Sequence, residues 1–323
     1  MITGIRHTGL VVEDLDQAIE FYGICSAFSE VKRTRVEDTA DNRKLLGIEN
    51  AAAETVEMRG TLGGLVLTKF DVTAPGDDPR HVYSAGIRHI CLQTPISNTY
   101  YTAMCEAGAG THSAPSGLGT GNSYVYIRDL EGNLLELEGT PWDPQVERPW
   151  YAHTAIVTTD IDRLTAFYEK LMGAPIKRRG TFGPNDKFDR VSGLKDIKLH
   201  GAWMSVGHSD IEFWQYLNPP TETAPSRKYN EPGWNCLGLE SDNIAADHAR
   251  LVAMGVEVSP DITNRDDHAY FTGRDPDGNI FEVLQPSKNV DRLSIPQASA
   301  DEEGAKIVAE RSRIIAAMAA VAN

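Results

Sequence analysis

Residues 6–22 read RHTGLVVEDLDQAIEFY, and 146 positions later residues 152–168 read AHTAIVTTDIDRLTAFY. The same offset relates residues 132–136, which read GNLLE, to residues 278–282, which read GNIFE. Each copy is long enough to be an ordinary domain. We therefore expect a duplicated chain, in which differences at matched positions indicate differences in role.

Composition and charge narrow the classes of partner. The 323 residues are 41% hydrophobic and 24% charged, which is typical of a globular protein, and the net charge is −15. Such a charge repels phosphate backbones and anionic bilayers, so we expect no nucleic-acid or membrane partner. No apolar run approaches the roughly 18 residues of a membrane span, no signal peptide is recognisable, and the four cysteines lack disulfide spacing. We expect a cytoplasmic protein that acts on a small molecule.

The hydrophobic periodicity predicts the same elements in each copy. Asp14 precedes residues 15–22, where apolar side chains recur at i, i+3, i+4 and i+7, the pattern of a capped amphipathic helix. Short apolar strands flank this helix, and a second strand–helix–strands round follows. It closes with a D-x-x-G-N turn at residues 129–133 and again at 275–279, because Gly and Asn tolerate positive φ. The chain therefore contains four similar modules.

Three motifs in this order resemble a known family. The opening H-x-x-L-x-V-x-D-L-x-x-A-I-x-F-Y, the central G-I-R-H and the closing R-D-x-x-G-N-x-x-E are similar to the vicinal oxygen chelate superfamily of glyoxalases, epimerases, bleomycin-resistance proteins and extradiol dioxygenases. The resemblance covers residues 1–286. It implies an α+β fold of paired βαβββ modules, each pair forming a cup of strands that holds a divalent metal. We expect domains at 1–145 and 146–286, and a tail at 287–323.

The resemblance also implies four metal-ligand positions in each copy. Copy one has His7, Val66, His89 and Glu136 at these positions. Copy two has His153, Glu212, Cys236 and Glu282. Two imidazoles and one carboxylate leave open coordination positions on a ferrous-type ion. The trio His7, His89 and Glu136 is therefore the predicted site, with Fe(II) favoured and Mn(II) or Zn(II) as alternatives.

Two other arrangements stay open. His153, Glu212 and Glu282 form an alternative or second site, with Cys236 as a fourth ligand. If instead the second module of copy one pairs with the first module of copy two, His89 and Glu136 join His153 and Glu212 in a full four-ligand set. His89 and Glu136 belong to both the trio and the cross-copy set.

The reaction follows from the ligand set that forms. Valine at position 66 leaves room for dioxygen beside a bound catecholate, and Tyr126 lies where extradiol enzymes place a substrate-binding tyrosine, so an extradiol-type dioxygenase is favoured with Tyr126 as a catalytic residue. The cross-copy set favours a metal-dependent isomerase, epimerase or glyoxalase-like lyase. The third alternative is a metal-free small-ligand-binding protein of the bleomycin-resistance type.

The tail lies outside the repeat. Apolar residues follow Pro296 at helical spacing: Ile307, Ile314, Met318 and Val321. Such a helix must bury this face, so it either packs on its own domain or seals a homodimer.

Overall fold

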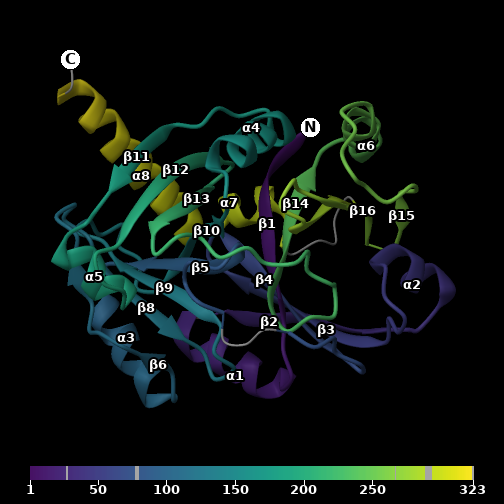
Figure 1. Ribbon diagram of the computed structural model, residues 1–323, viewed down its shortest axis with the longest axis horizontal. Coiled ribbons are helices and arrows are strands. Elements are labelled where there is room, and N and C mark those ends of the chain that lie inside the picture. The colour runs from purple at the N-terminus through teal and green to yellow at the C-terminus, as the bar shows by residue number, and fades with distance from the viewer. Residues whose placement is uncertain (27, 77–79, 266, 288–292, 322–323) are drawn as a thin grey trace.

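The computed structural model describes residues 1–26, 28–76, 80–265, 267–287 and 293–321. Its elements form the four expected modules and a helical tail (Figure 1). Module one comprises β1 (Ile2–Val11), α1 (Leu15–Ser26), β2 (Ser29–Val36), α2 (Ala40–Leu46), β3 (Ala53–Gly60) and β4 (Gly63–Phe70). Module two comprises β5 (Gly86–Thr94), α3 (Ser97–Glu106), β6 (Gly110–Thr111), β7 (Ser116–Gly117), β8 (Ser123–Arg128) and β9 (Leu134–Gly139).

The second copy repeats this order. Module three comprises β10 (Trp150–Val157), α4 (Ile161–Met172), β11 (Arg178–Phe182), α5 (Asp186–Ser192), β12 (Lys198–Val206) and β13 (Ser209–Asn218). Module four comprises β14 (Gly233–Ser241), α6 (Ile244–Ala253), β15 (Thr263–Asn264), β16 (His268–Arg274) and β17 (Ile280–Pro286). The tail contains α7 (Ile295–Ala300) and α8 (Glu302–Val321).

The modules pair across the two copies. The first sheet has the order β15-β16-β17-β14-β1-β4-β3-β2 and joins module four to module one. The second sheet has the order β11-β12-β13-β10-β5-β9-β8-β6, with β7 beside β8, and joins module three to module two. Figure 1 shows the two sheets on opposite sides of the molecule. The boundary predicted at residues 145 and 146 therefore marks the sequence repeat, but each sheet crosses it.

Helix caps and turns form as the sequence predicts. Asp14 accepts a hydrogen bond from the Gln17 backbone N–H at 3.0 Å, so the predicted cap of α1 is confirmed. In the D-x-x-G-N turn of module four, Asp275 accepts the backbone N–H groups of Asp277 and Asn279 at 2.9 Å. Gly278 has a φ of 81°, a backbone conformation that would be strained in a residue with a side chain.

Each turn is also fastened to the helix of a neighbouring module. Tyr22 of α1 donates to Asp129 at 2.9 Å, and the matched Tyr168 of α4 donates to Asp275 at 3.2 Å. All four side chains are buried. The main hydrophobic core likewise draws on both copies, since it contains Leu92 and Ile156 together. The core is shared by the two sequence copies.

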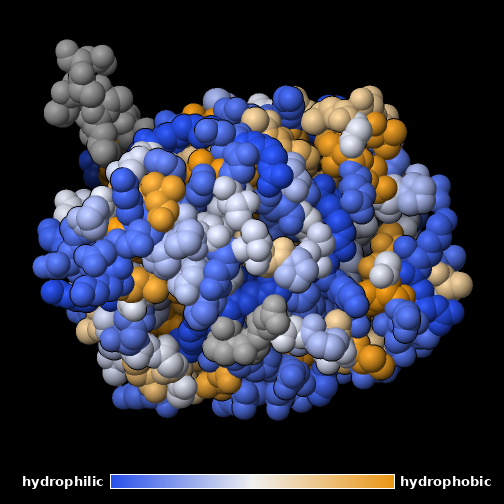
Figure 2. Space-filling view, in the orientation of Figure 1, coloured by the Kyte–Doolittle hydropathy of each residue, from blue (hydrophilic) through white to orange (hydrophobic). Residues whose placement is uncertain are grey.

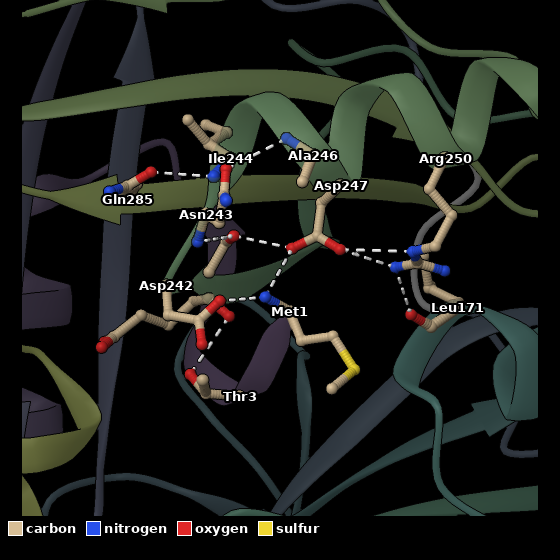
Figure 3. A network of polar contacts seen from close by, with 12 residues as sticks. Met1, Thr3, Leu171, Asp242, Asn243, Ile244, Ala246, Asp247, Arg250 and Gln285 are labelled. Atoms are coloured by element: carbon tan, nitrogen blue, oxygen red, sulfur yellow. Dashed lines mark hydrogen bonds and ion pairs between the residues drawn. The ribbon is translucent and has the colours of Figure 1, made fainter.

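A network of polar contacts at the N-terminus connects three modules. Asp247, which is buried on α6, lies 3.5 Å from the Met1 amino group and accepts a hydrogen bond from Arg250 at 2.9 Å. Arg250 also donates to the Leu171 carbonyl at the end of α4 at 3.0 Å, and Asp242 completes the network (Figure 3). The network therefore links modules one, three and four.

The tail packs on the body of its own chain. Ile307 of α8 is fully buried beside Leu62, Val146 and Trp150, and Arg311 donates to Asp210 at 2.5 Å. Ile314 is half-buried, whereas the side chains of Met318 and Val321 lie outside the described set. Within the described ranges, no helix is long and apolar enough to cross a membrane. The face shown in Figure 2 is mostly hydrophilic.

Candidate metal centre

Four adjacent strands of the second sheet each contribute one ligand-type side chain. Along the order β13-β10-β5-β9 these side chains are Glu212, His153, His89 and Glu136. One ligand atom of each lies within 4.8 Å of those of the others. At most 12% of any of the four side chains is exposed. The structure therefore brings together the cross-copy set.

Both imidazoles direct Nε2 toward the carboxylates. The His153 Nε2 lies 3.0 Å from Glu136 Oε2 and 3.2 Å from Glu212 Oε2, and the His89 Nε2 lies 3.6 Å from Glu136 Oε2. Neither Nε2 atom has a partner in hydrogen-bond geometry among the side chains and backbone that the structure describes. Buried polar atoms that face one point without such a bond suit a metal ion, which two nitrogens and two carboxylate oxygens can coordinate.

The charges in this cluster are strongly coupled. Burial disfavours ionisation of Glu136, but His153 and His89 outweigh it and hold the pKa of Glu136 well below its usual range. Burial would lower the pKa of His153, yet Glu212 and Glu136 raise it to about 9. Burial raises the pKa of Glu212 to about 7 and lowers that of His89. Without metal the cluster therefore retains a proton, which a bound cation would displace.

Two tryptophans hold Glu212 in place. Trp203 of β12 lies directly across from Glu212 and donates Nε1 to Oε1, while Trp214, two residues along β13, donates to Oε2 at 3.1 Å. Indole donors of this kind fix the orientation of a ligand carboxylate. The sequence analysis missed both residues. Strand alternation could have indicated Trp214, since it shares a face with Glu212.

Tyr126 lies beside the cluster. It is the cross-strand neighbour of Glu136 on β8, and its ring centroid lies 5.2 Å from that of His89. Burial raises the pKa of Tyr126 well above its usual value, so the phenol keeps its proton and can donate a hydrogen bond. The structure thus places Tyr126 next to His89 and Glu136. Its catalytic role remains a prediction.

The predicted trio is not assembled. His7 lies on β1 in the first sheet, where it joins Cys236 and Glu282 within 4.8 Å, whereas His89 and Glu136 lie in the second sheet. The reason is that β1 pairs with β14 while β5 pairs with β10, both antiparallel. The alternative set of His153, Glu212 and Glu282 is separated for the same reason.

The matched positions of the first sheet carry fewer ligand-type side chains. Val66 pairs with Gly9 as Glu212 pairs with Ala155, so an apolar side chain stands at the fourth ligand position. Burial raises the pKa of the Cys236 thiol well above its usual value. His7 packs over Gly238, where a Cβ would lie 2.2 Å from the ring. This group offers one imidazole, one thiol and one carboxylate.

Paired βαβββ modules around a buried His and Glu cluster define the class of protein. The family model of the glyoxalase/bleomycin resistance protein/dioxygenase superfamily matches residues 4–137 and 150–283. The chain belongs to this superfamily. The resemblance seen in the sequence and the predicted α+β fold of tandem modules are thereby confirmed.

Solved structures share the fold. Glyoxalase I from Zea mays is 13% identical, with a TM-score of 0.61 over 93% of this chain and 96% of that chain. A Bacillus subtilis protein titled "putative dioxygenase" is 12% identical, with a TM-score of 0.60 over 88% of this chain and 85% of that chain. No curated protein matches the chain. At these identities the likeness concerns the fold alone.

Proposed function

We propose that the protein is a divalent-metal-dependent enzyme that transfers a proton on a small substrate with adjacent oxygens, as an isomerase, epimerase or lyase does. The observation that carries this proposal is the convergence of His89, Glu136, His153 and Glu212, with both Nε2 atoms buried and without a hydrogen-bond partner among the described residues.

The donor set fits a divalent transition metal. Two imidazoles and two carboxylates suit Fe(II), Mn(II) or Zn(II), and they would leave part of the ion's coordination open to adjacent substrate oxygens. When bound, such an ion polarises those oxygens and lowers the pKa of the neighbouring C–H group.

The chain supplies the groups that move and direct the proton. The Glu212 carboxylate would hold the ion through one oxygen and accept a proton next to a carbonyl through the other, and Trp203 and Trp214 fix its position. Tyr126 retains its proton and donates to a substrate oxygen on the side of His89. Burial excludes water from both groups, which strengthens their electrostatic effect.

Ring-cleaving dioxygenation is the second candidate, because Tyr126 adjoins His89. A catecholate and dioxygen together would need more open coordination positions than four protein ligands would leave. The ligand set therefore favours proton transfer. A metal-free binding protein would have no use for the two inward-facing imidazoles.

Metal analysis tests the site. We expect about one equivalent of metal per chain in protein purified without oxygen and loaded with Fe(II), Mn(II) or Zn(II). His153→Ala should bind metal at least about tenfold more weakly. His7→Ala is the matched control, because His7 occupies the equivalent position in the other copy, and it should retain that equivalent. Loss on His7→Ala but not on His153→Ala would overturn the assignment.

A solvent-exchange assay tests the reaction. Metal-loaded protein incubated in D2O with a panel of α-hydroxyketones and hemithioacetals should exchange or move the α-proton at the same rate with and without oxygen. Glu212→Gln should abolish this exchange. Oxygen consumption with catechols, and no exchange with any carbonyl substrate, would instead support the dioxygenase.

A further inference from the structure

A second cluster of charged side chains lies at one end of the candidate centre. Four arginines line an open pocket near the starts of β5 and β14: Arg80, Arg88, Arg128 and Arg227. Trp234 and Asn133 complete its wall. The protein carries a net charge of −15, so a concentration of four guanidinium groups is unexpected.

Arg88 is the most informative of the four. Its side chain is buried and donates to the main-chain oxygens of Ile87 at 3.0 Å and His81 at 3.5 Å. Among the described residues, no acidic side chain forms an ion pair with Arg88, although Arg80 pairs with Glu231. The Nε atom of Arg80 is buried and lacks a hydrogen-bond partner within the same set.

Arg80 and Arg227 share the carboxylate of Glu231, but Arg88 has no acidic partner among the described residues, so an entering anion would stabilise it. A guanidinium group stays protonated in proteins, so Arg88 remains a buried cation beside three others. The planar fork of a guanidinium group matches the two oxygens of a carboxylate or phosphate.

A bulge directs Arg88 into the pocket. Ala155 pairs with His89 and Ile156 pairs with Ile87, so Arg88 is the extra residue of β5. The matched strand β14 has the same bulge at Asn235, which donates to the Tyr229 carbonyl at 2.7 Å. The bulge therefore forms with asparagine as well as with arginine. We infer that Arg88 has a role other than forming the bulge.

The pocket adjoins the candidate centre on the same strands. Arg88 directly precedes His89, and Arg128 lies on the same face of β8 as Tyr126, two residues further along. Two residues of a strand span about 7 Å. Along these strands, the positions of Arg88 and Arg128 therefore lie within about 7 Å of positions in the candidate centre.

We propose that this pocket binds the oxyanion group, a carboxylate or a phosphate, of an acidic small molecule. The link to substrate rests on the proposed function, and it restricts that substrate to molecules that carry an acidic group. Anion binding itself requires no metal, so the two proposals can fail separately.

Calorimetric titration of the metal-free full chain tests the pocket. Inorganic phosphate and succinate are titrated separately at constant ionic strength, so that phosphate and carboxylate preferences are distinguished. We expect saturable binding of at least one, weakened about tenfold or more by Arg88→Asn, the residue found in the matched bulge. Arg88→Lys keeps the positive charge but loses the planar guanidinium group. It should weaken anion binding less than Arg88→Asn does.

Two controls separate the interpretations. Arg274→Asn removes the same charge at the repeat equivalent of Arg128, outside this pocket, and should leave anion binding unchanged. His153→Ala should bind the anion normally even where it has lost metal. Circular dichroism checks that each variant is folded. Absence of saturable binding by both anions, or equal affinity of wild type and a folded Arg88→Asn, would overturn the proposal.

Discussion

Replacing Asp275 by asparagine is expected to remove a pH-dependent loss of stability. Asp275 is 5% exposed and sits under the turn of module four, where it accepts the backbone N–H of Asn279 and the Tyr168 hydroxyl. Burial raises the pKa of Asp275 from its usual 3.8 to about 6, although the hydrogen bonds from Asn279 oppose the rise. Asparagine has nearly the same shape and never ionises.

The sign and size follow from this rise. A carboxyl whose pKa is higher in the folded state stabilises most when protonated, so its contribution is complete below about pH 4 and is lost as pH rises to about 6. One pKa unit corresponds to about 1.36 kcal/mol, so the rise corresponds to about 3 kcal/mol. Relative to Asp275→Asn, the wild type should lose about this much free energy of unfolding between pH 4 and pH 7.

Urea unfolding followed by tryptophan fluorescence at several pH values measures this difference. Low protein concentrations are needed, because the net charge passes through zero near the pI of 5.0. Asp162→Asn is the control, since the Asp162 carboxylate is 88% exposed, and its difference from wild type should stay within about 0.5 kcal/mol. A difference between wild type and Asp275→Asn that does not change with pH would refute the reasoning.

Three further predictions concern the architecture. Ile307→Ala should lower the free energy of unfolding by about 2–5 kcal/mol, because the side chain is fully buried; a loss below 1 kcal/mol in urea titrations would mean that α8 does not dock. Gly238→Ala should lower the free energy of unfolding by about 1–3 kcal/mol, because the new Cβ would collide with the His7 ring. Adding His7→Ala should restore stability, whereas additive losses in this double-mutant cycle would argue against the contact. Cleavage at a protease site engineered into residues 143–148 should leave halves that co-elute in native gel filtration and separate in denaturant, whereas separate native elution would contradict the pairing across copies.

The sequence identifies the modules and the four candidate ligands but leaves the pairing of the modules open. Repeated motifs locate each strand and helix, because caps, turns and amphipathic faces are local features. His153 and Glu212 are recognised as ligand types, yet nothing local tells whether β10 pairs with β5 or remains within its own copy. Strand pairing depends on contacts between distant residues, which one sequence does not encode locally. Trp203 is missed for the same reason, and Arg88 is missed because a bulge alters the alternation.

The pairing across copies has a consequence for how the two cups can change. In a dimer of single-copy chains, one substitution would alter both cups at once. Fusion of the copies removes this constraint, because each cup now has its own codons in a single gene. Val66 in one copy corresponds to Glu212 in the other, and Arg88 corresponds to Asn235. One cup can thereby change at its candidate ligand positions, while the other keeps the cluster of His89, Glu136, His153 and Glu212 beside a group of arginines.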